Sequence, residues 1–139
     1  MAECMFCRIA AGTMPAEVVY EGPRALAFLD KFPSVRGHTL VIPRSHAPTL
    51  LELDDEDMAA LFRAVRAVTR KMKAGLGPAG FNIGWNHGAA AGQHVFHLHV
   101  HLLPRYGEGG RGVQSVAGGG GQGNLAEIAA AIRAAREGD

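Results

Sequence analysis

The hydrophobic residues of this chain follow two different patterns, and the first is typical of strands. Short apolar or alternating runs, rich in Val, Leu and Ile, occupy residues 17–21, 25–29 and 39–42 and are separated by turn residues. Two further runs of this kind occupy residues 81–85 and 95–103. Such runs favour strands, and the first three lie close enough along the chain to form an antiparallel meander.

The second pattern, in which apolar side chains recur every three or four residues, predicts a long helix over residues 54–74. Asp54 is suited to cap its first turn, and acidic residues follow. Basic residues fill the last turn, and Gly75 and Gly77-Pro78 end the pattern. A shorter helix is predicted over residues 125–136, with Asn124 as its cap. Strands gathered around one long helix indicate the α+β class, with an antiparallel sheet of about five strands, one long helix and a C-terminal helix.

Length and composition narrow the class of protein. With 139 residues, 47% of them hydrophobic, the chain can bury one core. We therefore expect a single domain over residues 1–139, with its core at about 4–106 and a tail and helix at 107–139. The glycine run 118–121 predicts a flexible loop.

Charge and hydropathy bear on partners and location. The formal charge of +1, with acids and bases mixed along the chain, predicts no surface for nucleic acid. No apolar stretch reaches the roughly 20 residues that span a bilayer, so we expect no membrane partner. Residues 1–8 lack the apolar segment of a secretory signal. A cytoplasmic protein is therefore expected.

Three histidines alternate with hydrophobic residues in the last predicted strand. Because successive side chains of a strand point to opposite faces, His97, His99 and His101 would share one face, about 7 Å from neighbour to neighbour. Leu98 and Val100 would point to the core. Three imidazoles on one face suit a metal site. They also suit attack on phosphorus by a neutral imidazole whose neighbours donate hydrogen bonds to phosphate oxygens.

The surrounding residues favour the second kind of chemistry. Residues 81–106 contain no Asp or Glu, whereas hydrolytic metal sites usually recruit carboxylates. The loop 88–93 consists of small residues and one glutamine, so its backbone N–H groups can approach a phosphate closely. A histidine with an unperturbed pKa of about 6.5 is largely unprotonated at neutral pH, so it can attack without a strong base or a metal.

The stretch 92–103, GQHVFHLHVHLL, resembles the signature of the histidine-triad (HIT) superfamily. Residues 26–30, residues 37–46 and Asn86, which precedes the first triad histidine by eleven positions, also resemble that family in order and spacing. The resemblance covers residues 4 to about 106. It implies a HIT-like fold and a purine nucleotide as the substrate.

The resemblance implies a role for each matching residue. His99, the middle histidine, would be the nucleophile that forms a nucleotidyl-histidine intermediate, and His101 would contact the phosphate. His38 would support the hydrogen bonds around the nucleophile, and His97 completes the triad. The residues implied at the nucleotide are Asp30 at the ribose hydroxyls, Asn86, Gly92, Gln93, His94 and Val95 at the phosphate, and Phe6, Ile9 and Phe28 at the purine.

Cys4 and Cys7 are spaced for a metal or a redox couple rather than for an ordinary structural disulfide. A short helical turn is predicted beside them at residues 6–11. Resemblance to bacterial-type HIT proteins implies a structural zinc ion held by Cys4, Cys7, His46 and His97. The alternative is two reduced cysteines with no metal.

The resemblance favours a nucleoside phosphoramidase, which cleaves a purine nucleotide from an amine. Residues 103–105, Leu-Pro-Arg, look like a stretch of dinucleoside polyphosphate hydrolases in the family and keep that activity open. A nucleotide-binding or scaffold protein with vestigial hydrolysis also fits the sequence, as does a metalloenzyme with three histidines on one metal. A homodimer is implied, with the long helix and residues 81–85 as the contact region.

Two histidines fit the resemblance less well. His94 stands where relatives often have a small hydroxyl residue, and it is either the general acid for the leaving group or an exposed loop residue. His87 has no assigned role.

Overall fold

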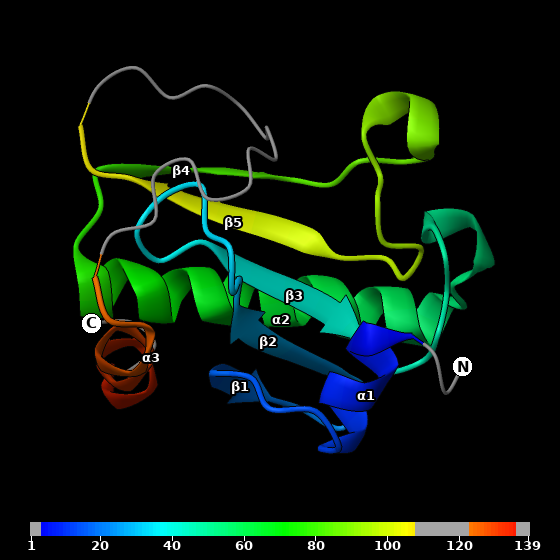
Figure 1. The fold of residues 1–139 in the computed structure, drawn as a ribbon, viewed down its shortest axis with the longest axis horizontal. Helices are drawn as coiled ribbons and strands as arrows, with labels where there is room; N and C mark the ends of the chain where they lie inside the picture. The colour runs from blue at the N-terminus through cyan, green and yellow to red at the C-terminus, as the bar shows by residue number, and fades with distance from the viewer. Residues whose placement is uncertain (1–3, 108–122, 136–139) are drawn as a thin grey trace.

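A computed structural model describes residues 4–107 and 123–135. Among these residues, five antiparallel strands form one sheet; the long helix α2 lies across one face, and the short helix α1 packs against the other near one end (Figure 1). This arrangement confirms the α+β class predicted from the sequence. The helices and strands are α1 Met5–Ala11, β1 Val18–Glu21, β2 Ala25–Leu29, β3 Thr39–Pro43, η1 Leu50–Glu52, α2 Asp55–Leu76, β4 Gly80–Gly84, η2 Ala89–Ala91, β5 Val100–Arg105 and α3 Leu125–Ala134.

The strands lie in the order β1-β2-β3-β5-β4. β1, β2 and β3 form the predicted meander, and β5 then lies between β3 and β4, which leaves β4 at an edge. β3 and β5 pair from Thr39↔Leu102 to Val41↔Val100. Side chains of β3 and β5 are therefore neighbours, although α2 and β4 separate the two strands in the sequence.

The fifth strand begins later than the sequence predicted. β5 starts at Val100, so the first two triad histidines lie in an irregular segment before it, and the single strand expected over 95–103 is wrong in its first half. The cause lies in β3, which ends at Pro43, because a proline has no N–H to donate to a neighbouring strand. The segment finds another partner, since the Leu98 N–H donates to the Ala47 carbonyl at 2.8 Å.

Two separate groups of apolar side chains bury the two faces of the sheet. On the α2 side, Val41 and Val100 belong to a core that α2 and α3 complete. On the α1 side, Phe6 packs with side chains of β2 and β3 that include Leu40. Because side chains alternate along a strand, His101, the register partner of Leu40, faces the α1 side.

Helix α2 runs two residues past its predicted end. Asp54 caps it as predicted, since its side chain accepts a hydrogen bond from the Asp57 N–H at 2.8 Å. Gly75 lies inside the helix, which ends at Gly77 with a left-handed φ of 67°. A Cβ atom on Gly75 would lie 2.5 Å from the carbonyl oxygen of Ala131, so this glycine lets α3 approach α2 closely.

Helix α3 begins as predicted, because the Asn124 side chain accepts a hydrogen bond from the N–H three residues on, at 3.1 Å. The helix ends at Ala134, two residues before the predicted end. Arg136 and the predicted flexible loop 118–121 lie outside the described residues. Over the ranges that are described, no helix is both long and apolar enough to cross a membrane.

Gly75→Ala is expected to destabilise the protein, although alanine favours a helix over glycine by about 1 kcal/mol. The new Cβ would press on the backbone of α3, so we expect the free energy of unfolding to fall by about 1–3 kcal/mol in chemical denaturation. Gly80→Ala is the control, because a Cβ there meets no atom of residues 4–107 and 123–135 within 4 Å. A Gly75→Ala protein at least as stable as the wild type would contradict the close approach of the two helices.

Candidate active site and metal cluster

The segment before β5 is held by the last residue of β3 and by the residues that follow it. The Nε2–H of His97 donates to the Pro43 carbonyl at 2.8 Å, since a carbonyl oxygen only accepts. Further along, the N–H of Leu98 donates to the Ala47 carbonyl at 2.8 Å. The two irregular segments therefore lie side by side, at the end of the sheet where α1 packs (Figure 1).

His99 is oriented by the backbone two residues earlier. Its Nδ1 lies 2.8 Å from the carbonyl oxygen of His97 and must carry the proton of this hydrogen bond. A neutral His99 therefore has its lone pair on Nε2. Its ring packs edge-to-face against Phe6, with centroids 5.2 Å apart, and against His101, with centroids 5.0 Å apart.

A chain of hydrogen bonds determines which nitrogen of His101 is protonated. The backbone N–H of Ser34 donates to His38 Nδ1 at 3.2 Å, so the proton of a neutral His38 is on Nε2. That Nε2–H donates to His101 Nδ1 at 2.9 Å, which leaves the proton of His101 on its Nε2. In the described part of the chain this buried Nε2 has no hydrogen-bond partner. A buried donor without a partner is costly unless a ligand supplies the acceptor.

Burial keeps these imidazoles neutral. His38 and His101 are 2% and 3% exposed. Loss of water, followed by the effect of His99, lowers the pKa of His38 to about 4. Loss of water, followed by the effects of His99 and His38, lowers the pKa of His101 to about 3. Burial also lowers the pKa of His99, so at neutral pH its Nε2 lone pair is available for attack.

Asp30 lies directly after β2, beside these histidines. Its Oδ1 accepts a hydrogen bond from the Phe32 N–H at 2.9 Å, and its Oδ2 lies 3.6 Å from His38 Nε2. Burial raises the pKa of the Asp30 carboxyl, an effect that the Phe32 hydrogen bond opposes. The residue predicted at the ribose is thus brought next to the His38–His101 pair.

A second cluster lies on the other side of His97. Ligand atoms of Cys4, Cys7, His46 and His97 all lie within 4.8 Å of one another. Nδ1 of His97 is 3.4 Å from Cys4 Sγ and 3.5 Å from Cys7 Sγ, and Nδ1 of His46 is 3.3 Å from Cys7 Sγ. In a tetrahedral site with bonds of about 2.3 Å to sulfur and about 2.0 Å to nitrogen, sulfur and nitrogen ligands are about 3.5 Å apart. The four side chains therefore fit a four-coordinate ion.

The chemistry of the donor atoms agrees with this geometry. The hydrogen bond to Pro43 holds the proton of His97 on Nε2 and leaves the Nδ1 lone pair facing the sulfurs, as a metal-binding histidine requires. Cys4 caps α1, and its sulfur accepts a hydrogen bond from the Cys7 N–H at 3.4 Å. Burial and the adjacent Cys4 raise the pKa of the Cys7 thiol. Two thiolates this close are unfavourable without a cation between them.

The residues predicted at the purine are buried beside His99. Phe6 and Phe28 are 5% and 3% exposed, and their ring centroids are 5.5 Å apart. Ile9 and the partly buried Val95 pack in the same apolar cluster. The structure therefore brings this predicted group together, next to the ring of the candidate nucleophile.

The loop predicted at the phosphate is braced by Gln93. The Gln93 side chain accepts a hydrogen bond from the Gly88 N–H at 2.8 Å and donates to the carbonyls of Pro48 and Val95, at 2.7 and 3.0 Å. The backbone N–H groups of Gly92 and Gln93 both donate to carbonyls within the loop, at 3.0 Å. In this conformation Gln93 positions the loop, and its N–H and that of Gly92 are already engaged.

The remaining loop residues differ in their exposure. Asn86 lies beside Gly92, because a Cβ there would be 3.5 Å from Asn86 Nδ2. Gly92 itself has a left-handed φ of 99°, which favours glycine. His94 and His87 are exposed.

Several residues that hold the site together were missed from the sequence. Asp57 in α2 is 7% exposed and accepts hydrogen bonds from the Ser45 hydroxyl and the Arg24 guanidinium, both at 2.9 Å. Arg44 donates to the Ala10 carbonyl at 2.8 Å and so ties α1 to the segment after β3. Three acids occupy the first turn of α2, and nothing in the sequence singles out Asp57 among them.

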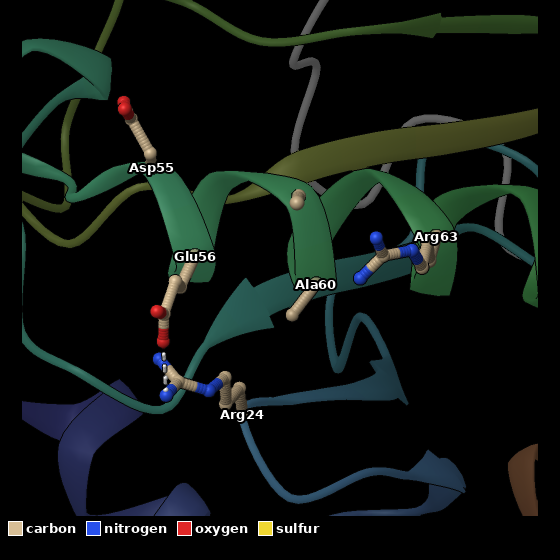
Figure 2. Close-up of a pocket in the computed structure, with 6 residues that line it drawn as sticks. Arg24, Asp55, Glu56, Ala60 and Arg63 are labelled. Carbon is tan, nitrogen blue, oxygen red and sulfur yellow. Dashed lines mark hydrogen bonds and ion pairs between the residues drawn. The ribbon is translucent and has the colours of Figure 1, made fainter.

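A surface pocket contains none of the predicted site residues. It is lined by Arg24 and by residues near the start of α2, among them Glu56, Ala60 and Arg63 (Figure 2). Glu56 points toward Arg24 and pairs with it at 2.7 Å. The opposite charges of this pocket therefore neutralise each other, and the pocket offers no match to an anionic nucleotide.

Comparison with known proteins agrees with the histidine geometry. The sequence pattern of the HIT domain family matches residues 11–108. An adenosine 5'-monophosphoramidase of Schizosaccharomyces pombe is 40% identical over 102 residues, which are 73% of this chain and 74% of that protein. An adenylylsulfatase of Arabidopsis thaliana is 40% identical over 103 residues, 74% of this chain and 52% of that protein. The crystal structure of a Zn-bound histidine triad family protein from Mycobacterium smegmatis is 36% identical, with a TM-score of 0.81 over 96% of this chain and 92% of that one.

The free energy of unfolding is expected to fall as the pH drops below about 6.5. Above that pH, His38 and His101 are neutral in the folded and the unfolded chain and contribute no pH dependence. Below it, the unfolded histidines bind protons that the folded ones, with pKa values of about 4 and about 3, do not. Each costs about 1.4 kcal/mol per pH unit until its folded pKa is reached. Chemical denaturation at pH 7, 6 and 5 measures this slope.

The double variant His38→Asn/His101→Gln is the control for that slope. It keeps the cysteines, His46 and His97, so any pH dependence of that cluster is common to both proteins. The variant should lose less stability per pH unit than the wild type. Equal slopes would contradict the neutral state of the two buried histidines.

Proposed function

Because this chain belongs to the HIT domain family, we propose that it hydrolyses purine nucleotide conjugates at the α-phosphorus, and specifically that it is a nucleoside phosphoramidase. One observation supports this above all: among the described residues, the buried Nε2–H of His101 has no partner, and it lies next to His99, whose Nε2 is unprotonated. An unprotonated nitrogen beside an unfilled donor suits a phosphate group, because phosphorus accepts the nucleophile while its oxygens accept hydrogen bonds.

In the first step, Nε2 of His99 attacks the α-phosphorus and the bond from phosphorus to the leaving amine breaks. The Nδ1–H remains bonded to the His97 carbonyl, which stabilises the positive charge that develops on the ring. The Nε2–H of His101 donates to a phosphate oxygen, and one well-placed donor of this kind contributes about 3 kcal/mol in the transition state. The amine takes its proton from water or from the exposed His94.

In the second step, water attacks the phosphorus and the bond to Nε2 of His99 breaks. The electron pair of that bond returns to Nε2, and a proton of the water passes to the solvent. The net reaction consumes one water and releases a nucleoside monophosphate and the amine. The ring nitrogens of His99, His101 and His38 then hold the same protons as at the start.

We assign the other predicted residues to the nucleotide. Asp30 binds the ribose hydroxyls, an assignment supported by its position 3.6 Å from His38. The base lies against the apolar cluster around Phe6, which packs on the ring of His99. The phosphate lies near Asn86 and the loop residues Gly92, Gln93, His94 and Val95; the side chains of Phe6, Ile9 and Phe28 form the base-binding group.

The two named relatives support a nucleotide hydrolase and differ in the leaving group. The monophosphoramidase of Schizosaccharomyces pombe favours an amine as the first leaving group to test. A single metal bound by all three triad histidines has less support. In the described ranges, the group of residues able to hold a metal includes His97 alone of the three, while His99 bonds to a carbonyl and His101 bonds to His38.

We further propose that Cys4, Cys7, His46 and His97 hold a structural zinc ion. The ligand spacing supports this, as does the Zn-bound relative from Mycobacterium smegmatis. Four protein ligands fill a tetrahedral site and leave no position for a substrate, so the role of this site is structural. It would fasten α1 to the segment that follows β3.

A homodimer is the third part of the proposal. β4 lies at an edge of the sheet, and its Ile83 is 45% exposed. An edge strand with an exposed apolar side chain favours pairing with a second strand. We therefore propose that two copies meet through β4 and the adjoining part of α2.

His99→Ala is expected to lower the turnover of adenosine phosphoramidate by several orders of magnitude, because the nucleophile is lost. Binding of AMP, measured by calorimetry, should survive. In the wild type, rapid quenching with labelled substrate should trap a nucleotide on His99. His87→Ala is the matched control, since this histidine is exposed and has no assigned role.

Two results would overturn this assignment. Wild-type turnover in His99→Ala would exclude the nucleophile. A clear preference for diadenosine polyphosphate over adenosine phosphoramidate would replace the phosphoramidase by the polyphosphate hydrolase.

Cys4→Ser/Cys7→Ser is expected to remove the zinc that the reduced wild type contains, about one ion per chain, measured by elemental analysis. Because metal binding stabilises the folded state, a chelator should lower the melting temperature of the wild type and leave that of the double variant unchanged. Zinc-free wild type with a melting temperature insensitive to chelation would exclude the structural site.

A further inference from the structure

One peptide group joins the metal cluster to the candidate nucleophile. The carbonyl of His97 accepts the Nδ1–H of His99 at 2.8 Å. The N–H of the same peptide group, on Leu98, donates to the carbonyl of Ala47 at 2.8 Å. This group is therefore held from both sides, and His99 takes its orientation and its protonated nitrogen from it.

The ligands of the cluster stand at both ends of this link. His97 supplies the carbonyl while its ring belongs to the cluster, and His46 directly precedes Ala47. The two cysteines lie at the start of α1, whose Phe6 packs on the ring of the candidate nucleophile. Each of the four ligand residues is therefore adjacent in sequence to a group that orients the His99 ring, contains such a group, or contacts a residue that does.

The two ring nitrogens of His97 differ in the strength of their interactions. Its Nε2–H makes a hydrogen bond of 2.8 Å to Pro43, whereas its single Nδ1 lone pair faces two sulfurs, Cys4 Sγ at 3.4 Å and Cys7 Sγ at 3.5 Å. Thiols are weak donors, and one lone pair accepts well from one of them at a time. A metal ligand bond on Nδ1 is strong and directional by comparison.

We propose that this cluster positions the nucleophile: with a metal bound, Cys4, Cys7, His46 and His97 hold the 97–98 peptide group and thereby keep the proton of His99 on Nδ1 and its Nε2 free. The identification of His99 as the nucleophile rests on the proposed function. Cys4 and Cys7 are then positioning residues. When the peptide group can rotate, the proton of His99 divides between the two ring nitrogens, and Nε2 is blocked in part of the molecules.

The test reads the ring of His99 directly. Protein with ¹⁵N-labelled histidine is compared with one equivalent of Zn²⁺, after chelation, and as Cys4→Ser/Cys7→Ser. The His99 signals are those that disappear in His99→Ala. Ring ¹⁵N shifts distinguish protonation on Nδ1 from protonation on Nε2, and we expect Nδ1 alone with zinc and a mixture without it.

Kinetics supply the second readout. Removal of the metal, by chelation or by the double cysteine variant, should lower kcat by about 10- to 100-fold, the usual effect of losing an outer support of a reactive group. KM should rise as well if α1, which carries Phe6 and Ile9, shifts when the metal is lost, so the fall in kcat is the part that reports on His99. His46→Gln takes the place of the cysteine variant if the latter does not fold.

Thr13→Ala, two residues after the end of α1, is the matched control. It removes the hydrogen bond of 3.2 Å from the Thr13 hydroxyl to the Arg8 carbonyl, in the last turn of α1, and changes no ligand. It should keep the zinc-bound ¹⁵N pattern and the wild-type kcat. Unchanged His99 ring shifts on removal of zinc would overturn the proposal. An equal loss of kcat in Thr13→Ala would overturn it as well. If zinc-loaded wild type fails to turn over any nucleotide, the proposed function fails, while the ring shifts still decide the coupling.

Discussion

The hydrogen bond from His97 Nε2–H to the Pro43 carbonyl is the interaction on which the two clusters depend. It selects the nitrogen that faces the sulfurs, and it seats the irregular segment against the end of β3. Proline suits this place because it ends the pairing of β3 with β5, whose last pair is Val41↔Val100. The carbonyl of the same residue can then serve a side chain instead of the neighbouring strand.

The five residues 43–47 connect most of the elements around the site. Each residue makes a different contact, and together the contacts reach α1, α2 and the segment before β5. The contacts are Pro43 with His97, Arg44 with Ala10 of α1, Ser45 with Asp57 of α2, His46 with Cys7, and Ala47 with Leu98. A short irregular segment thus replaces the missing end of the strand ladder as the support of the histidines.

The features that depend on neighbouring residues were predicted well from the sequence. The caps Asp54 and Asn124 are examples, because a cap and the N–H that it binds lie within three residues. The start of β5 was not predicted, because it depends on Pro43 in a strand far away in the sequence. Gly75 looked like a helix end and is instead a point of contact with α3. Both errors concern tertiary partners, which periodicity does not report.

The residues of the candidate site also divide into those that the sequence predicted and those that it did not. The spacing of the triad histidines and of the two cysteines marked both clusters, since these residue types are rare and chemically specific. Ser34 was missed because its backbone N–H and its hydroxyl reach His38 across a turn, and the residue types in that turn do not mark the contact. Asp57 was missed because its burial, and not its type, distinguishes it from the other acids at the start of α2.

The chain of hydrogen bonds from Ser34 through His38 to His101 begins at the backbone N–H and the hydroxyl of Ser34, which lie 3.2 and 3.3 Å from His38 Nδ1. Neither an amide N–H nor a serine hydroxyl ionises near neutral pH, so this chain holds a proton in place and supplies none. The buried side of the site therefore has no proton to spare for a leaving group. Any such proton must enter from the side of His94, which faces the solvent. Substrates would then be sorted by how readily their leaving group departs with water or His94 as its proton donor.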